Sequence, residues 1–593
     1  MAKKKPLKKD RLAKNHLKYG EKKQPFYLEA QQKQNRSKPK KNPFGDEWEI
    51  AQETVAPGEY QAECTALDED GNGVIRVEGV KLSVPAVLPG EQITVEVWGK
   101  KKPHAKLIQV QKASKDRVKA KCPVFYRCGG CRLQHMSYDA QLDWKQKQVE
   151  RLMQEYIGKG AKFYQIIGME QPWNYRNKSH TAFAMNGRQQ IVSGIYEENS
   201  HRVVPTEHCL IQSERADRII RSIRQIMKEC KLLPYDEDSE TGLLRHVLIR
   251  EGFTSGEVMV VLVTASMIFP ARSRFVSLLR EKHPEITTII MNCNPKKTSM
   301  VLGEQERILY GKGWIEDSLC QKTFAISPKS FYQVNPVQTQ ALYQRALQMA
   351  ALTGKERVLD AYCGIGTISL IAAQQAKEVL AVELNRDAVR DAVSNAKRNG
   401  IKNVRFFCDD AGRFMTEMAA GNETADVVLM DPPRSGSDEA FLRSVCTLSP
   451  KKIVYISCNP QTQKRDLKTL TAAGYQVREI QPVDLFPHTA HCETIVLLSK
   501  LKTKKHINIE LRTDEFDLTA SESKATYAKI KQYVLEKHGL KVSSLNIAQI
   551  KQKCGIKERD NYNLSKKENV KQPQCTVEKE KAIMDAFRHF QMI

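Results

Sequence analysis

A regular alternation of strand and helix patterns over residues 316–500 constrains the fold of this chain most strongly. Short apolar runs such as Val379-Leu-Ala-Val-Glu383 predict strands, and the segments between them predict helices. Strands that are separated by helices usually lie parallel in one sheet with helices on both faces. The sequence therefore predicts an α/β domain with a doubly wound parallel sheet over 316–500.

A glycine-containing loop follows the first clear strand of this domain. The strand Arg357-Val-Leu-Asp360 leads into Gly364-Ile-Gly366, where the absent side chains let the backbone pass close to a ligand. The next strand ends in Glu383, which can accept hydrogen bonds from ribose hydroxyls, and the third ends at Asp410, which suits an adenine ring. A dinucleotide-binding loop has a third glycine where this chain has Ser369. The loop therefore favours S-adenosylmethionine over NAD.

One thiol and one carboxylate lie at the ends of apolar runs in the same domain. Cys458 ends a run at Ser457-Cys-Asn-Pro460, and Glu493 comes just before another run. A thiolate that adds to C6 of uracil makes C5 nucleophilic enough to accept a methyl group, and a base must then remove the C5 proton. Such a thiol needs access and a low pKa. The pair predicts this chemistry; the alternative is a buried structural thiol and a surface acid.

A separate group of cysteines lies upstream. Cys122, Cys128 and Cys131 have C-x5-C-x2-C spacing with two glycines among them, and Cys209 is the candidate fourth ligand. Three thiolates so close in sequence indicate a bound metal or cluster. Zinc and a [4Fe–4S] cluster both accept four cysteines, so the spacing leaves the two open.

The remaining sequence divides by composition into four further parts. Short alternating runs broken by turn residues predict a small β-barrel, mixed patterns predict a central α+β domain, and two Lys-rich parts flank the whole. The predicted parts are a basic disordered arm over 1–51, the barrel over 52–113, the cysteine-bearing domain over 114–315 and a helical extension over 501–593. Within the extension, helices are expected over 526–537 and 544–553.

The charge of the chain points to its partner. The net charge is +25 with a pI of about 9.3, and such an excess favours nucleic acid. The longest apolar stretch, near 258–269, is too short to span a bilayer, and the Lys-rich start is not a secretion signal. Fifteen cysteines in a chain without that signal predict a reducing, cytoplasmic location. No obligate protein partner is indicated.

Taken together, these motifs resemble the RNA uracil-5-methyltransferases. The resemblance rests on Phe331-Tyr-Gln-Val-Asn335, Asp431-Pro-Pro-Arg434, Ser457-Cys-Asn-Pro460 and His491-Cys-Glu-Thr494. It implies a class I methyltransferase domain with Cys458 as nucleophile and Glu493 as the base for the C5 proton. It also implies that S-adenosylmethionine is contacted by Gln333, Tyr362, Glu383, Asp410 and Asp431.

The barrel and the cysteines narrow the resemblance to one branch. The barrel resembles the TRAM domain of RNA-modifying enzymes, and ribosomal RNA members of the family carry a [4Fe–4S] cluster on cysteines that match Cys122, Cys128, Cys131 and Cys209. Both features imply 23S ribosomal RNA as the partner. The alternatives are a transfer-RNA uracil-5-methyltransferase and a non-catalytic RNA-binding ribosome-assembly protein. An amino-group methyltransferase is disfavoured, because Arg434 replaces the aromatic residue that stacks on the base in such enzymes.

Overall fold

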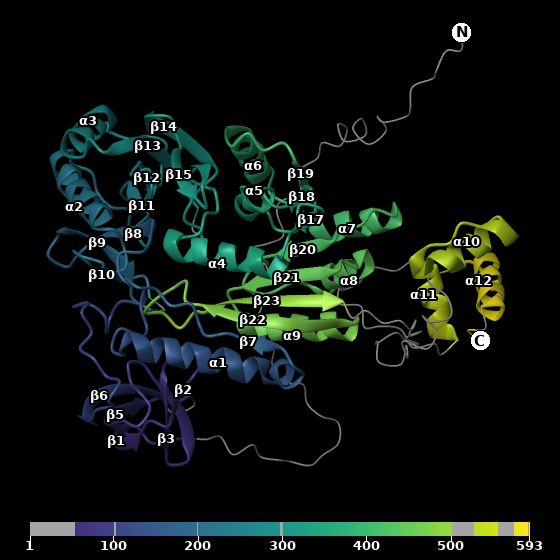
Figure 1. Ribbon diagram of the computed structural model, residues 1–593, viewed down its shortest axis with the longest axis horizontal. Coiled ribbons are helices and arrows are strands. Elements are labelled where there is room, and N and C mark those ends of the chain that lie inside the picture. The colour runs from purple at the N-terminus through teal and green to yellow at the C-terminus, as the bar shows by residue number, and fades with distance from the viewer. Residues whose placement is uncertain are drawn as a thin grey trace, which may run out of the picture. The chain divides into compact units, whose positions relative to one another are not determined.

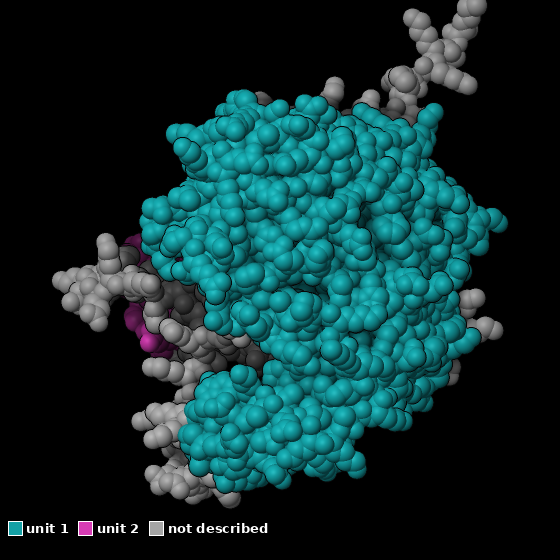
Figure 2. Space-filling view, turned by 90° about the vertical axis from the view of Figure 1, so that its left-hand side faces the viewer, with its two compact units in different colours: residues 1–501 teal, residues 502–593 magenta. Residues whose placement is uncertain are grey.

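The computed structural model describes residues 54–99, 102–198, 200–296, 300–500, 527–554, 575–590 and 592. The predicted basic arm over 1–51 lies outside these residues. The chain divides into two compact units, Met1–Leu501 and Lys502–Ile593, which Figure 2 distinguishes by colour.

The N-terminal part of the first unit is rich in β-structure. Two three-stranded antiparallel sheets, in the orders β1-β5-β6 and β2-β3-β4, share one apolar core (Figure 1). Buried and more exposed side chains alternate along β5, because successive residues of a strand point to opposite faces. The strands are β1 (Gly58–Glu63), β2 (Ala66–Leu67), β3 (Gly73–Val77), β4 (Val80–Val84), β5 (Gln92–Trp98) and β6 (His104–Lys112).

A seven-stranded mixed sheet forms the middle of the first unit, in the order β10-β9-β8-β11-β12-β13-β14. Helices α2 and α3 pack on one face, where Ile223, Phe275 and Val260 share a core. On the other face, Leu248 shares a core with Leu342 of α4. The elements are β8 (Lys178–Met185), β9 (Ile191–Tyr196), β10 (Val203–Pro205), α2 (Glu214–Glu229), β11 (Leu244–Glu251), β12 (Val258–Thr264), α3 (Arg272–Lys282), β13 (Ile286–Cys293), β14 (Gln305–Tyr310), the hairpin β15 (Ile315–Leu319) and β16 (Lys322–Ile326), and α4 (Pro336–Ala350).

An eight-stranded sheet follows, in the order β19-β18-β17-β20-β21-β23-β22-β7. The first five strands are parallel, but β23 is antiparallel to both of its neighbours. The predicted parallel sheet is therefore mixed, because the connection from β22 to β23 contains no crossover helix and brings the chain straight back. The elements are β17 (Arg357–Asp360), α5 (Thr367–Ala372), β18 (Glu378–Glu383), α6 (Arg386–Arg398), β19 (Val404–Cys408), α7 (Ala411–Ala420), β20 (Val427–Met430), α8 (Glu439–Leu448), β21 (Lys452–Ser457), α9 (Pro460–Ala472), β22 (Tyr475–Val483) and β23 (Glu493–Lys500).

This sheet also uses residues that come far earlier in the chain than 316–500. Strand β7 (Lys162–Phe163) pairs with the edge strand β22. Helix α1 (Tyr138–Gly158) lies along the same edge, and its Val149, Met153 and Tyr156 belong to the core of the sheet (Figure 1). Helix α1 thus packs into the apolar core of this domain.

A buried ion pair fastens α1 to the connection between β22 and β23. Lys145 of α1 donates to Asp484 at 2.6 Å, and both side chains are fully buried. Asp484 also accepts a hydrogen bond from the Tyr138 hydroxyl at 2.8 Å, and Lys145 donates to the Phe486 carbonyl at 3.2 Å. The charges are therefore matched by polar partners, as burial requires.

The described residues of the second unit form three helices around an apolar core of their own. Ile530, Ile547 and Phe587 meet in that core, one from each helix. The helices are α10 (Tyr527–His538), α11 (Ser544–Lys553) and α12 (Val577–His589). The third of these was not predicted from the sequence. Across all described residues, no helix is long and apolar enough to cross a membrane.

We expect Lys145→Met to lower the free energy of unfolding by about 3–5 kcal/mol, because the change leaves Asp484 as a buried carboxylate without its cation. Urea denaturation followed by circular dichroism measures the loss. The control is Lys147→Met on the exposed side of the same helix, where the pair with Asp143 is open to solvent and should contribute nothing measurable. Equal midpoints for the two variants would contradict the structural role of Lys145.

Candidate active site

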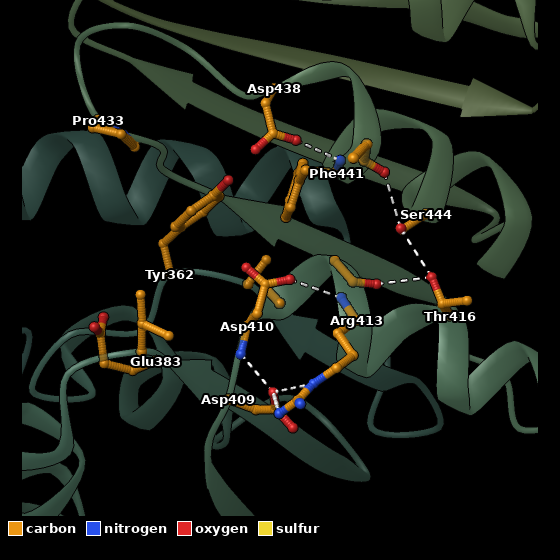
Figure 3. Close-up of a pocket in the computed structure, with 15 residues that line it drawn as sticks. Tyr362, Glu383, Asp409, Asp410, Arg413, Thr416, Pro433, Asp438, Phe441 and Ser444 are labelled. Carbon is orange, nitrogen blue, oxygen red and sulfur yellow. Dashed lines mark hydrogen bonds and ion pairs between the residues drawn. The ribbon is translucent and has the colours of Figure 1, made fainter. Parts of the chain in front are cut away.

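A cavity of about 430 Å³ opens at the carboxyl ends of β17, β18 and β19. Tyr362, Glu383 and Asp410 each follow or end one of these strands and surround the cavity (Figure 3). Phe441 of α8 lies opposite, with its ring centroid 5.1 Å from that of Tyr362. The cavity therefore combines two aromatic rings with several carboxylates, Glu383 and Asp410 among them. This set suits a nucleoside, whose base packs on rings and whose ribose hydroxyls donate to acids.

The glycine loop fixes the position of the Glu383 carboxylate. The backbone N–H of Gly364 donates to one oxygen of Glu383 at 3.1 Å, and that of Asn385 donates to the other at 2.7 Å. Gly366 has φ of +84°, and a Cβ atom there would lie 3.2 Å from the Phe406 ring. Both the conformation and the space therefore favour glycine. Each Glu383 oxygen keeps a further lone pair for a ligand.

Asp410 has a second task in the structure. Its side chain caps α7 by accepting the Arg413 N–H at 2.9 Å, and it remains exposed to solvent. Capping places one carboxylate oxygen at the helix N-terminus and leaves the other directed to the cavity side.

Gln333 and Asp431 lie outside the lining of this cavity and near the hydroxyl of Tyr343. The Gln333 side chain hydrogen-bonds Tyr343, and the charge of Asp431 is the main electrostatic cause that raises the pKa of this buried phenol. The Thr367 hydroxyl is 3.5 Å from the same oxygen. The predicted cofactor residues therefore form two groups, one around the cavity and one beside it.

Buried carboxyl groups lie at the end of the sheet where the parallel strands finish, from β17 across to β23. Burial raises the pKa of Asp360 to about 7, although the Ser369 hydroxyl donates to it. Burial together with the nearby Asp360 also raises the pKa of Asp431 to about 7. Burial and Asp431 raise the pKa of Glu493 well above its ordinary value. These acids hold protons more tightly than free acids do.

Strand pairing brings Cys458 and Glu493 together. In the antiparallel pair of β21 and β23, Ser457 lies opposite Thr494, so the next position on each strand places Cys458 opposite Glu493. Both groups end at the same edge of the sheet, and the Glu493 charge acts directly on the thiol. Residues that face each other across such a pair have Cβ atoms about 5 Å apart.

The thiol of Cys458 differs from the expected low-pKa group. Burial, followed by the carboxylates of Glu493 and Asp431, raises its pKa to about 12, and the Arg434 guanidinium partly opposes this rise. The sequence places the cysteine at a strand end but does not show that two acids lie beside it. In the free protein the thiol is therefore protonated at neutral pH.

A second cavity, of about 160 Å³, opens at Cys458 and shares no lining residue with the first. Arg434 and His491 lie on one side, where they approach to 3.4 Å. Sequence reasoning missed its other wall, which is formed by the β2–β3 turn with Asp70 and by α1 with Trp144, Lys145 and Gln148 among its lining residues. The only local signal was a polar Lys145 at helical spacing from buried Gln141 and Val149.

The structure also gathers the four predicted metal ligands. The pKa of Cys131 rises to about 12, mainly through burial and then through the neighbouring Cys209, Cys128 and Cys122. Cys209 likewise responds to Cys128. Among the described residues, no group of three or more His, Cys, Asp or Glu side chains could hold a metal ion as they stand.

Comparisons with known proteins identify relatives over most of the chain. Residues 137–501 match the family model described as tRNA (Uracil-5-)-methyltransferase. An uncharacterized RNA methyltransferase of Halalkalibacterium halodurans is 44% identical over 438 residues, covering 73% of this chain and 95% of the relative. Another, from Caldanaerobacter subterraneus subsp. tengcongensis, is 41% identical over 445 residues, covering 74% of this chain and 98% of the relative.

A solved structure supports the same relationship. The tRNA (uracil-54, C5)-methyltransferase of Pyrococcus abyssi, in complex with S-adenosyl-L-homocysteine, aligns with a TM-score of 0.60 and 27% identity. The alignment covers 74% of this chain and 99% of the Pyrococcus chain. The eight-stranded sheet accordingly has the class I methyltransferase fold.

The coupled acids predict a pH dependence of stability. Because folding raises the pKa of Asp431 from about 4 to about 7, the folded chain binds more protons than the unfolded chain between these values. The stability that Asp431 contributes is therefore full at low pH and is lost as the pH rises through 7. We expect Asp431→Asn to flatten the fall in Tm between pH 5 and 8. Asp410→Asn, which keeps a capping side chain at an exposed position, is the control and should follow the wild type.

Proposed function

Because this chain belongs to the tRNA (uracil-5-)-methyltransferase family, we propose that it methylates C5 of a uridine in 23S ribosomal RNA through a covalent adduct with Cys458. Membership in the family establishes an RNA methyltransferase that uses S-adenosylmethionine. The observation that carries the mechanism is the strand register that sets Cys458, which lines the second cavity, opposite Glu493.

The first cavity accommodates the methyl donor. S-adenosylmethionine, when bound, supplies an electrophilic methyl group on sulfur. Glu383 and Asp410 would hold the ribose and adenine parts, and the Tyr362 and Phe441 rings would pack against the base. Gln333 and Asp431 lie towards Cys458 and would hold the methionine part, where the charge of Asp431 favours a cationic sulfonium.

Cys458 begins the reaction from the second cavity. The thiol loses its proton to water there, helped by the positive charge of Arg434, and its sulfur forms a bond to C6 of the uracil. The electron pair of the C5–C6 double bond moves into the ring carbonyl system. C5 would then form a bond to the methyl carbon as the bond between that carbon and the donor sulfur breaks, and the electron pair of the broken bond would stay on sulfur.

Glu493 completes the reaction. Its carboxylate takes the C5 proton, the ring double bond forms again, and the bond between C6 and the Cys458 sulfur breaks with its electron pair returning to sulfur. Burial raises the pKa of Glu493 well above its ordinary value. This makes its ionised form a stronger base than a carboxylate in water.

Two features support 23S ribosomal RNA as the substrate. The β-rich region over 58–112 suits a TRAM-like RNA-binding barrel, and its Asp70 lines the cavity beside Cys458. The four gathered cysteines match those of the ribosomal branch. Transfer RNA is the second candidate, because the solved relative from Pyrococcus abyssi acts on transfer RNA according to its name.

The gathered cysteines support a [4Fe–4S] cluster. A single zinc ion needs four sulfur atoms within about 2.3 Å of one point, whereas a [4Fe–4S] cluster binds each thiolate through a different iron and tolerates wider spacing. Cys122, Cys128, Cys131 and Cys209 are half-buried, and the other three act electrostatically on Cys131. The cluster would brace the loop of Cys128 against the end of β9, where Cys128 bridges to Glu197.

The first experiment incubates the purified protein with S-adenosylmethionine and, separately, unmodified 23S ribosomal RNA and bulk transfer RNA. Mass spectrometry of the digested RNA should detect 5-methyluridine only in 23S. Cys458→Ala should abolish the product because no adduct can form, while Cys408→Ala, an exposed thiol at the end of β19, should retain it. Product in transfer RNA alone would keep the chemistry and replace the substrate.

A second variant separates the two halves of the reaction in the same assay. Glu493→Gln cannot take the C5 proton, so turnover should fall by about 10²–10⁴-fold while an RNA–protein adduct accumulates on denaturing gels. If Glu493→Gln turns over as fast as the wild type, another residue is the base.

The cluster is tested by purification without oxygen. We expect about four irons and four inorganic sulfides per chain, and Cys128→Ser should lose them. Cys230→Ser at the end of α2, outside the gathered cysteines, is the control and should retain them. A stoichiometric content of zinc without sulfide would overturn the assignment.

A further inference from the structure

Three cationic side chains gather on one face of the seven-stranded sheet. Lys178 of β8 lies directly opposite Arg250 of β11, so the two side chains project from the same face. Arg176 precedes β8 by two residues and acts electrostatically on Lys178. Like charges that face each other across a strand pair are destabilising, so this arrangement costs stability in the free protein.

Two of these cations, the buried Arg250 and the partly buried Lys178, lack an acid to balance them in the described part of the chain. The Arg250 side chain is 4% exposed; it donates to the backbone carbonyl of Ser330, and its Nε atom has no hydrogen-bond partner. Burial lowers the pKa of Lys178 to about 8, helped by Arg250 and Arg176, and burial lowers that of Arg250 to about 10. Within the described residues, no carboxylate acts on the charge of either group.

The neighbouring groups on this face do not supply the missing charge. His180 lies two residues along β8, and burial together with Lys178 lowers its pKa to about 4, so it is neutral. Arg245 of β11 is paired with Glu237 and is thereby satisfied. A buried cationic pair without a counter-charge is expected where an anion binds.

The position of the cations connects them with the proposed active site. Asn177, between Arg176 and Lys178, donates its side-chain N–H to the carbonyl of Gln333 at 3.1 Å. Arg250 bonds the carbonyl of Ser330 in the same segment. Between these two anchors lies Phe331, whose side chain is 69% exposed. An exposed aromatic ring beside buried cations is the combination that binds a base and its phosphate in single-stranded nucleic acid.

We propose that Arg176, Lys178 and Arg250 form a binding site for a backbone phosphate of the RNA substrate, with Phe331 stacking on an adjoining base. The phosphate supplies the charge that the sheet face lacks, and Arg250 offers its unpaired Nε–H. The inference rests on the RNA substrate of the proposed function and adds the contact that places the strand in front of Gln333 and the two cavities.

Lys178→Met tests the proposal by moving stability and binding in opposite directions. At neutral pH the unfolded chain binds the Lys178 proton more tightly than the folded chain, so removing this charge should raise the Tm of the free protein. Affinity for a fluorescent RNA substrate, measured by anisotropy, should fall by about tenfold. The slope of log K against log salt should become shallower by about 0.7, as expected for one phosphate contact to single-stranded RNA. Affinity for S-adenosylmethionine should stay unchanged.

Two matched variants serve as controls. Lys178→Arg keeps the charge and should keep the RNA affinity. Lys282→Met makes the same change at an exposed position of α3, on the opposite face of the sheet, and should alter neither Tm nor binding. RNA affinity and salt slope that are unchanged in Lys178→Met would overturn the proposal. A loss of S-adenosylmethionine binding alone would also overturn it, by assigning the anion to the cofactor carboxylate.

The same data distinguish this inference from the proposed function. Wild-type protein that forms 5-methyluridine while Lys178→Met binds RNA equally well would refute the phosphate site alone. Wild-type protein that forms no 5-methyluridine in any RNA, with Lys178→Met still weakened in RNA binding, would refute the proposed reaction and leave the phosphate site in place.

Discussion

The ion pair between Lys145 and Asp484 holds together the two halves of the proposed active site. Lys145 belongs to a helix that precedes the catalytic sheet by nearly 200 residues in the sequence, and Asp484 begins the connection that leads to Glu493. Several other contacts converge on this connection; Gln141 accepts the His488 N–H, and Asn335 donates to the Leu485 carbonyl. The segment before the proposed base is therefore fixed from both sides.

The buried acids explain why such rigid support is needed. Besides burial, Asp360 raises the pKa of Asp431, and Asp431 raises that of Glu493. Cys458 responds to both Glu493 and Asp431. A fold that keeps carboxyl groups together away from water must hold them by packing and hydrogen bonds elsewhere. Catalytic sites commonly contain groups with perturbed pKa values, and a stable scaffold holds these groups in place. Here the apolar core of the sheet and the α1 contacts form that scaffold.

Local sequence patterns could predict those strands and turns whose structure is determined by residues close together in the sequence. The strand ends at Asp360, Glu383 and Asp410 and the glycine turn between them follow from short-range periodicity. The reversed β23, the addition of α1 and β7 to the sheet, and the cavity wall at Asp70 and Trp144 depend on contacts between distant segments. The raised pKa of Cys458 has the same origin, because it comes from acids on other strands.

Because β23 runs antiparallel to β21, the pairing of these two strands sets the spacing between Cys458 and Glu493. Cys458 and Glu493 are set opposite each other by the ladder of β21 and β23. A shift of the ladder by a single residue would turn Glu493 to the other face of the sheet. The position of Glu493 beside Cys458 therefore depends on the exact register of the β21–β23 ladder.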